Sequence, residues 1–334
     1  MNNSGFRVPH PRDAFVIVAR VGKPYAGVRM THRLRSISTL APLIYCGLAF
    51  WALSVCAQAA WSQKPQIRIE LRDRQGARIA GTDNLAASSA VLVFEREYQP
   101  GDRIVIAGPR RIAVQLDENM PECRLYLAGN SVEGFSFDIP YGNGETQTGS
   151  AYAPEAFAGK AHRIVVRTWK PAGERNLALN PCDQADVPGQ LKPQAFPHAC
   201  SNSVTRGSPE FQERNAIDGV TQNGHHGAWP YQTWGPELRG DLWWKLDFGR
   251  PVEVTKLRLM IRADFPHDGY WQSAVVEFSD GSRLPIQIAP SAGFQEFSFA
   301  ERRVTWLRLT QLVPADRSKY SGLVELEAWG RDIE

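Results

Sequence analysis

The sequence predicts an all-β protein built from two β-sandwich domains, at residues 60–170 and 174–332. Short segments in which apolar and polar residues alternate recur along both regions, as expected of half-buried strands. Turn-forming residues separate these segments, since the chain contains 28 Gly and 23 Pro among its 334 residues. No segment shows a helical period of comparable strength. The length also suits two domains of ordinary size, each able to bury its own core.

The first predicted domain contains seven short strands in about 100 residues, a density typical of an antiparallel sandwich. Tyr98–Asp102 joins two of these strands and carries the Pro-Gly pair of a tight turn. The strands are predicted at Gln66–Leu71, Ala90–Phe94, Arg103–Ala107, Ile112–Leu116, Cys123–Leu127, Phe135–Ile139 and His162–Arg167. These residues do not indicate a family for this domain.

The second predicted domain begins after Lys170–Gly173, a Pro- and Gly-containing joint. Strands recur beyond it at similar spacing, and Ser279–Ser282 is a strong hairpin turn between two of them. The clearest strands are predicted at Lys256–Arg262, Ala274–Phe278, Leu284–Ile288, Thr305–Leu309 and Leu323–Trp329. Such a set of strands is typical of a jelly roll.

Residues 1–59 have the layout of a secretory signal rather than of a domain. Thr31–Arg35 is basic, Ala41–Cys56 is apolar and uncharged, and Ala57–Ala59 supplies the small residues that a signal peptidase prefers. Met30 immediately precedes the basic stretch and is the expected true start. We therefore expect an exported protein, periplasmic or secreted, without a stable membrane span after cleavage. A retained anchor is the alternative, although the apolar run is short for a bilayer.

The net charge of the mature chain argues against nucleic-acid binding. The whole sequence carries 38 Lys and Arg against 35 Asp and Glu, a net charge of +3. Residues 1–59 hold seven of the basic residues and one Asp, so removing them leaves 31 basic against 34 acidic residues, a net of −3. The basic character therefore belongs to the targeting segment, and no nucleic-acid partner is expected.

Three cysteines remain after cleavage: Cys123, Cys182 and Cys200. In an oxidising compartment, one disulfide and one free thiol is the simplest arrangement. Cys182 and Cys200 lie 18 positions apart in a Pro-rich, irregular stretch and are the expected pair. Metal ligation is the alternative, but no CxxC spacing supports it.

Four segments in the last third of the chain carry a family resemblance. They are Arg175–Asn180, Asn215–Gly219, Asp241–Gly249 and Leu323–Gly330, which occur in this order. Together they resemble the F5/8 type C (discoidin) family, which includes many family 32 carbohydrate-binding modules. The resemblance covers about residues 174–332. It implies a discoidin-like jelly roll with the galactose-binding-like fold, which recognises a glycan without catalysis.

Two aromatic-rich loops are the candidate ligand site: the first ligand loop, residues 223–234, and the second ligand loop, residues 262–271. Sugar recognition needs aromatic faces for the C–H patches of the ring and planar polar groups for the hydroxyls. In the family that the domain resembles, an Arg in the position of Arg262 often contacts the sugar. The candidate ligand-binding residues are His225, His226, Trp229, Tyr231, Trp234, Arg262, Asp264, His267 and Trp271.

Alternatives stay open for several of these residues. Trp234 and Trp271 also suit core packing beneath the loops. Arg262 also suits a structural salt bridge to Asp264 or Asp268. Zinc ligation by the three loop histidines, with the two aspartates, is a further alternative, although their spacing matches no established zinc motif.

The resemblance also implies a structural calcium ion below the loops. Asp218 and Glu325 match the two side-chain ligands of the family, and oxygen ligands of this kind suit Ca²⁺. The chain departs from the family pattern at Val220, where an acidic residue is usual. Val220 would then offer its carbonyl and Asn223 its amide oxygen. A hydrogen-bonded loop capped by Asp218 is the alternative.

The sequence thus predicts an exported, non-catalytic carbohydrate-binding protein whose partner is a glycan or polysaccharide. No catalytic residues are identified, since no G-x-S-x-G, HExxH or phosphate-loop motif occurs. One alternative is a secreted glycan-active enzyme whose catalytic centre lies in the first domain or in the interdomain cleft. Another is an adhesion protein whose aromatic loops bind a protein or a lipid headgroup.

Overall fold

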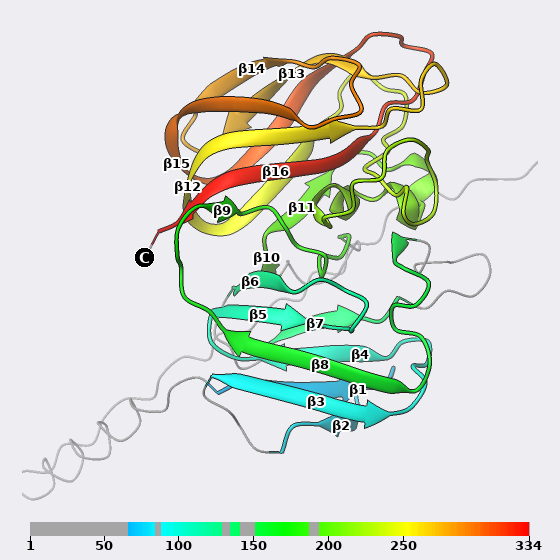
Figure 1. Ribbon diagram of the computed structural model, residues 1–334, viewed down its shortest axis with the longest axis vertical. Coiled ribbons are helices and arrows are strands. Elements are labelled where there is room, and N and C mark those ends of the chain that lie inside the picture. Colours follow the sequence, from blue (N-terminus) through cyan, green and yellow to red (C-terminus); the bar gives the residue numbers. More distant parts are fainter. Residues whose placement is uncertain (1–65, 84–87, 129–133, 141–150, 187–193, 334) are drawn as a thin grey trace, which may run out of the picture. The chain divides into compact units, whose positions relative to one another are not determined.

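The computed structural model describes residues 66–83, 88–128, 134–140, 151–186 and 194–333 (Figure 1). All of them belong to one compact unit, residues 62–334. The signal predicted at residues 1–59 lies outside the described residues. Strands dominate, and the described helices are short 3-10 segments, so the all-β prediction is confirmed. None of the described helices is long and apolar enough to cross a bilayer.

The N-terminal sandwich consists of two antiparallel sheets. Its strands are β1 (Arg68–Arg72), β2 (Arg78–Gly81), β3 (Ser89–Glu95), β4 (Arg103–Ala107), β5 (Arg111–Gln115), β6 (Cys123–Leu127), β7 (Phe135–Asp138), β8 (Ala161–Thr168) and β10 (Ala195–Phe196). One sheet has the order β2-β1-β4-β7 and the other β10-β6-β5-β8-β3. The seven predicted strands are therefore all present. The short edge strand β2 escaped prediction because its residues are mostly exposed and show no alternation.

Strand β10 comes from far along the chain yet extends the N-terminal sandwich. Ala195 and Phe196 pair with Leu127 and Tyr126 of β6. Ala195 and Cys182 both belong to the apolar core of this sandwich. The chain around Cys182 and β10 is therefore packed into the N-terminal sandwich.

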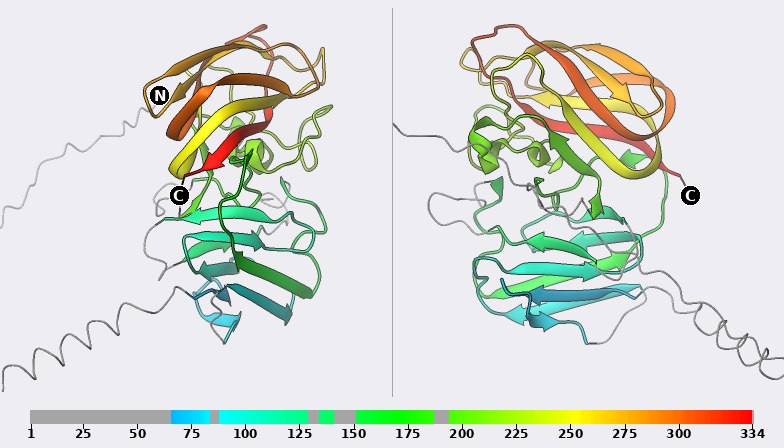
Figure 2. Two further views of the ribbon diagram at one scale, coloured as in Figure 1. Left: turned by 60° about the vertical axis from the view of Figure 1, so that its left-hand side comes forward. Right: turned by 180° about the vertical axis from the view of Figure 1, so that it is seen from behind.

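The C-terminal sandwich is dominated by two long, bent strands. Its strands are β9 (Arg175–Asn176), β11 (His198–Ser201), β12 (Trp244–Ile261), β13 (Trp271–Phe278), β14 (Arg283–Gln287), β15 (Gln295–Pro314) and β16 (Leu323–Asp332). They pair in the order β14-β13-β15-β12-β16-β9, with β11 added to β12. Figure 2 shows the curvature of these strands from two further sides. The predicted β-sandwich with jelly-roll strands is confirmed.

Strand β12 changes partners along its length. Its first residues, 244–247, pair with β11, whereas residues 252–261 pair with β16. The register shifts between Asp247 and Val252, and Gly249 lies in this interval with a φ of 65°. A Cβ atom at Gly249 would also lie 2.3 Å from the ring of Phe196. Only glycine therefore suits this bend, which lets one strand serve both layers of the sandwich.

The structure contradicts the predicted disulfide between Cys182 and Cys200. The Sγ atom of Cys182 lies 2.9 Å from the Sγ atom of Cys123, and both side chains are buried. Cys200 lies in β11 opposite Lys245 of β12 instead. The prediction failed because short sequence separation was taken for proximity. The chain between the two cysteines crosses from one sandwich to the other through β10.

Candidate functional site

The candidate site lies at one end of the C-terminal sandwich, where three connections meet (Figures 1 and 2). They join η5 (Glu213–Ile217) to β12, β12 to β13, and β15 to β16. Backbone hydrogen bonds tie them together: Ala263 N donates to Asn223 O at 2.8 Å, and Gly269 N donates to Tyr320 O at 2.9 Å. The two ligand loops predicted from the sequence are thus adjacent.

A cavity of about 360 Å³ opens between these connections. We call it the Arg262 cavity. Its lining residues come from four segments of the chain, which include η3 (Thr205–Gly207) and η4 (Pro209–Phe211). They are Thr205, Arg206, Phe211, His226, Gly235, Glu237, Arg262, His267, Asp268 and Tyr320. Three residues predicted to bind the ligand, His226, Arg262 and His267, are therefore brought together.

Arg262 is a buried cation fixed in the wall of this cavity. Its side chain is only 4% exposed, and its Nη2 atom lies 3.1 Å from Asp268 Oδ1. Nη2 also donates to Tyr320 O at 3.4 Å. The Nε atom is buried and has no hydrogen-bond partner among the described residues. The predicted structural salt bridge is thus present for Asp268, while part of the guanidinium still lacks an acceptor.

Gly322 makes room for Arg262. A Cβ atom at position 322 would lie 2.9 Å from Arg262 Nε and 3.1 Å from Thr233 Oγ1. Both contacts are shorter than a side chain tolerates without displacement of its neighbour. The backbone N–H of Arg262 also donates to Gly322 O at 3.0 Å. Gly322, directly before β16, therefore leaves the space that the guanidinium occupies.

The histidines and aspartates of the two ligand loops form a contiguous cluster. The rings of His226 and His267 stack with centroids 5.0 Å apart and planes 2° apart. His267 Nδ1 lies 3.5 Å from Asp268 Oδ1 and 3.9 Å from Asp264 Oδ2. Burial lowers the pKa of His226, and the nearby Arg262 guanidinium lowers it further. His226 is therefore neutral at neutral pH and can act as a hydrogen-bond acceptor.

The aromatic residues predicted to bind the ligand differ in how exposed their side chains are. Trp234 is fully buried and stacks on Trp271 at a centroid distance of 5.6 Å, as the core-packing alternative expects. Trp271 is 3% exposed and does not line the Arg262 cavity. Trp229 is 38% exposed, and half-buried Tyr231 lies 5.5 Å from the ring of His225. Of the three predicted tryptophans, only Trp229 is therefore exposed.

Two aromatic residues of the cavity were missed by the sequence analysis. Phe211 lies in η4, and a Cβ atom at Gly235 would lie 2.8 Å from its ring. Tyr320 belongs to the connection between β15 and β16 and is 44% exposed. Both are far in sequence from the two ligand loops. The only available signal was the Ser-, Lys- and Gly-rich surroundings of Tyr320, which are typical of a loop.

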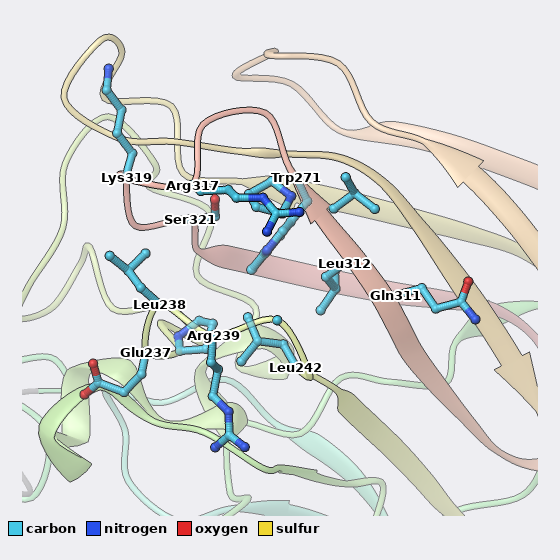
Figure 3. Close-up of a pocket in the computed structure, with 14 residues that line it drawn as sticks. Glu237, Leu238, Arg239, Leu242, Trp271, Gln311, Leu312, Arg317, Lys319 and Ser321 are labelled. Carbon is cyan, nitrogen blue, oxygen red and sulfur yellow. The ribbon is translucent and has the colours of Figure 1, made fainter.

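A second cavity, of about 480 Å³, lies next to the first (Figure 3). Glu237 lines both cavities, and consecutive residues Tyr320 and Ser321 line one each. The floor is apolar, formed by Leu242, Trp271 and Leu312 (Figure 3). Ser321 Oγ is buried there without a partner among the described residues. The two cavities are therefore neighbours.

Asp218 and Glu325 form a buried pair of carboxylates below the loops. They are 5% and 1% exposed. Burial raises the pKa of Asp218 to about 6, and burial together with the charge of Asp218 raises the pKa of Glu325 well above its ordinary value. Gln232 Nε2 donates to Asp218 Oδ2 at 2.8 Å, but Gln232 Oε1 is buried without a partner among the described residues. These oxygen atoms suit a hard divalent cation.

The other two predicted calcium ligands have different surroundings. The Val220 N–H donates to Asp218 Oδ1 at 2.8 Å, which keeps this backbone next to the carboxylate. The Asn223 amide donates to the carbonyl oxygens of Ile261 and Ala292, at 3.0 and 2.8 Å. Gln232, which the sequence analysis missed, contacts Asp218 directly. It therefore replaces Asn223 among the candidate calcium ligands.

A second titratable cluster surrounds His198 in β11. Its Nδ1 atom lies 2.8 Å from Asp183 Oδ1, and its Nε2 atom lies 3.4 Å from Asp186 Oδ1. Burial alone would lower the pKa of His198, but the two carboxylates raise it to about 10. Burial raises the pKa of nearby Glu213 to about 7. Because both ring nitrogens face carboxylates, the arrangement is an ion pair between imidazolium and carboxylates.

The raised pKa of His198 makes stability fall as the pH rises. Folded His198 keeps its proton up to about pH 10, whereas the unfolded chain releases it near 6.5. The contribution is therefore fully present below about pH 6.5 and is lost as the pH approaches 10. From pH 7 to pH 9.5 we expect the unfolding free energy of the unchanged protein to decrease as the pH rises. This decrease should be steeper than that of His198→Gln by up to about 1.4 kcal/mol per pH unit. Urea unfolding of both proteins at several pH values measures this, and equal slopes would contradict it.

A family described as a domain of unknown function (DUF7402) matches residues 192–329. No curated protein matches the sequence.

Solved structures similar to the chain include chitosan-binding module 1 from the chitosanase/glucanase of Paenibacillus sp. IK-5, with 20% identity and a TM-score of 0.33 over 47% of this chain and 99% of that one. Another is CpGH89CBM32-5 from Clostridium perfringens, in complex with GalNAc-β-1,3-galactose, with 17% identity and a TM-score of 0.31 over 39% and 92%. A third is the Streptococcus pneumoniae fucose-binding module SpX-3, with 16% identity and a TM-score of 0.32 over 46% and 96%. At these scores the sandwich assignment rests on the strand pairing described above.

Proposed function

We propose that this is an exported, non-catalytic carbohydrate-binding protein that holds a glycan in the Arg262 cavity. The observation that carries the proposal is the guanidinium of Arg262, which is fixed by Asp268 and has a buried Nε atom without an acceptor among the described residues. A buried donor without a partner is costly. Because Arg262 lines the cavity, a ligand that brings an oxygen atom there would accept a hydrogen bond from its guanidinium.

The rest of the cavity suits a sugar ring. Tyr320, 44% exposed, offers an aromatic face at the entrance. Neutral His226 and the Glu237 carboxylate can accept hydrogen bonds from hydroxyls on the same ring. An aromatic face combined with a few placed polar groups is the general composition of such sites. Because a single sugar site recovers little free energy beyond the cost of association, we expect dissociation constants of roughly 10 µM to 1 mM.

The full chain is expressed, and the resulting protein is screened on a glycan array to test the proposal. Binding to a defined sugar class, and competition by the free sugar, would support it. The Val93→Ala variant is the matched control, because Val93 is 67% exposed on the N-terminal sandwich, far in sequence from the cavity. Absence of binding by protein shown to be folded would refute the proposal. A turnover assay on the same polysaccharides tests the enzyme alternative.

A structural calcium ion is part of this proposal. Asp218, Glu325 and the free Oε1 of Gln232 would hold it, with the backbone at Val220 beside them. When bound, the ion would neutralise two buried carboxylates and stiffen the segment that leads from η5 into the first ligand loop. It is assigned no direct contact with the glycan.

Calcium is expected to stabilise the protein by about 2.7 kcal/mol at a concentration one hundred times its dissociation constant. Thermal unfolding with calcium and with EDTA measures this effect. The Glu325→Gln variant should lose the response to calcium. In EDTA the same variant should be more stable than the unchanged protein, because one member of a buried like-charge pair is gone. A variant that is less stable in EDTA would favour the hydrogen-bonded loop capped by Asp218.

One observation favours the adhesion alternative. Five of the eight large apolar side chains that are exposed in the described chain lie in the C-terminal sandwich at or near this end: Trp229, Leu238, Phe265, Val313 and Tyr320. Exposed apolar groups of this kind can insert into a membrane surface or pack on a protein. Sedimentation with liposomes, comparing Phe265→Ser with the unchanged protein, distinguishes this function from glycan binding.

A further inference from the structure

One cluster of side chains in the loops resembles a metal site. Among the described residues, His226, Asp264, His267 and Asp268 each offer a nitrogen or oxygen atom, and these atoms all lie within 4.8 Å of one another. Imidazole nitrogen and carboxylate oxygen are the donors that zinc accepts besides thiolate. We propose that these four residues bind a divalent transition-metal ion, with zinc as the expected ion.

Two atoms of the cluster lack the partners that buried polar groups normally have. Asp268 is 4% exposed, and its Oδ1 atom faces Arg262, but its Oδ2 atom is buried without a partner among the described residues. The same holds for His226 Nδ1. Such groups are rare in folded proteins because each forfeits a hydrogen bond that water would have supplied. One ion bound between the two loops would satisfy both atoms.

The geometry requires a small inward movement of the exposed ligands. In a tetrahedral zinc site with bonds of about 2.1 Å, the ligand atoms lie about 3.4 Å apart. The present spacing of up to 4.8 Å must therefore contract, and the parallel ring of His267 must turn so that its nitrogen points at the ion. The side chain of His267 is 66% exposed and that of Asp264 is 36% exposed, so both can move. Asp268, which is 4% exposed and paired with Arg262, is the fixed part of the site.

The charges around the cluster favour a divalent cation. Asp264 and Asp268 contribute two negative charges, and Arg262 offsets one of them. A bound zinc ion would convert a local charge of −1 into +1, and Arg262 would keep its contact with the other oxygen of Asp268. Because the guanidinium opposes the ion, both carboxylates are needed. The ion would lie in the wall of the Arg262 cavity, but its ligands are protein side chains, so the inference does not depend on glycan binding.

Isothermal titration with zinc chloride tests the inference on the protein obtained from the full chain. We expect one saturable site, and at least tenfold weaker binding in His226→Gln and in Asp264→Asn. The matched control is Cys200→Ser, which dismantles the other cluster able to hold zinc, Asp186, His198 and Cys200. This control should retain the affinity of the unchanged protein within about threefold. Thermal unfolding without zinc verifies that each variant is folded.

Several results would overturn the inference. Absence of a saturable site in the unchanged protein would do so. Loss of binding in Cys200→Ser with retention in His226→Gln would place the ion at the His198 cluster instead. Glycan binding is measured separately, in EDTA and in zinc. A protein that binds glycan in EDTA but never binds zinc would leave the proposed function standing and remove the metal site.

Discussion

Arg262→Lys is expected to weaken glycan binding at least tenfold while the protein remains folded. Lysine keeps a positive charge beside Asp268 but loses the planar fork of donors, including the Nε atom that lacks an acceptor in the structure. A charged hydrogen bond contributes about 1.5 to 3 kcal/mol, so its loss corresponds to roughly tenfold or more in the dissociation constant. Titration with the best sugar from the array measures the change.

Arg262→Ala should have the larger effect, on binding and on stability together. It leaves the Asp268 carboxylate buried and unpaired, which costs about 3 to 5 kcal/mol of unfolding free energy. The Arg262→Ala, Asp268→Ala double variant removes that charge, so it should regain stability but not binding. This separation distinguishes a residue that contacts the sugar from one that only holds the loop.

Arg258→Lys is the matched control for this series. Arg258 lies near the end of β12, which Arg262 directly follows, and it also faces a carboxylate, with Nη1 2.7 Å from Glu327 Oε2. It does not line the Arg262 cavity. We expect its glycan affinity to be unchanged. If Arg262→Lys binds sugar as tightly as Arg258→Lys, the guanidinium is structural and the proposed site is wrong.

The strands of this protein were predictable because each obeys a local rule. In β1 the apolar residues Ile69 and Leu71 are fully buried and alternate with polar residues, and the sequence shows this alternation directly. Strand β12 was only partly predicted, because its first half continues through Gly249 into a second set of partners. A bend of this kind depends on a close approach to Phe196, which no local pattern reveals.

The site was predictable where one loop carried several of its residues. Arg262, His226 and His267 were expected to act together, and they line one cavity. Phe211 and Tyr320 could not be assigned, because their contribution depends on how distant segments pack. Trp234 is a loop residue that was considered a ligand candidate but is fully buried. Local sequence does not distinguish a loop side chain that packs into the core from one that faces a ligand site. The contacts of the predicted residues with a ligand stay a prediction.

Cys123 and Cys182 are expected to form a disulfide in the exported protein, with Cys200 left as the free thiol of the mature chain. The two Sγ atoms are 2.9 Å apart and 59 residues apart in sequence. Their oxidation releases two protons and passes two electrons to a disulfide oxidant of the export compartment. A loop of this length is expected to stabilise the folded state by about 4 kcal/mol in the chain-entropy model.

The number of reactive thiols and the free energy of unfolding test this expectation. Denatured, unreduced mature protein should show one reactive thiol, and reduction should lower the unfolding free energy. Cys123→Ala should be destabilised to a similar extent, whereas Cys200→Ser should retain both the disulfide and the stability. Three reactive thiols in the exported protein would contradict the expectation.

The burial of both thiols also determines when the bond can form. Burial and the neighbouring Cys182 raise the pKa of Cys123 well above its ordinary value, so its nucleophilic thiolate is scarce in the folded protein. Protein that folds in the reduced state should therefore oxidise slowly, and mild denaturant should accelerate the reaction by exposing the pair. Because Cys182 lies in the segment between β9 and β11 of the second sandwich, the disulfide would lock that segment to β6. Its loss should then be visible first as weaker protection of β10 in hydrogen exchange.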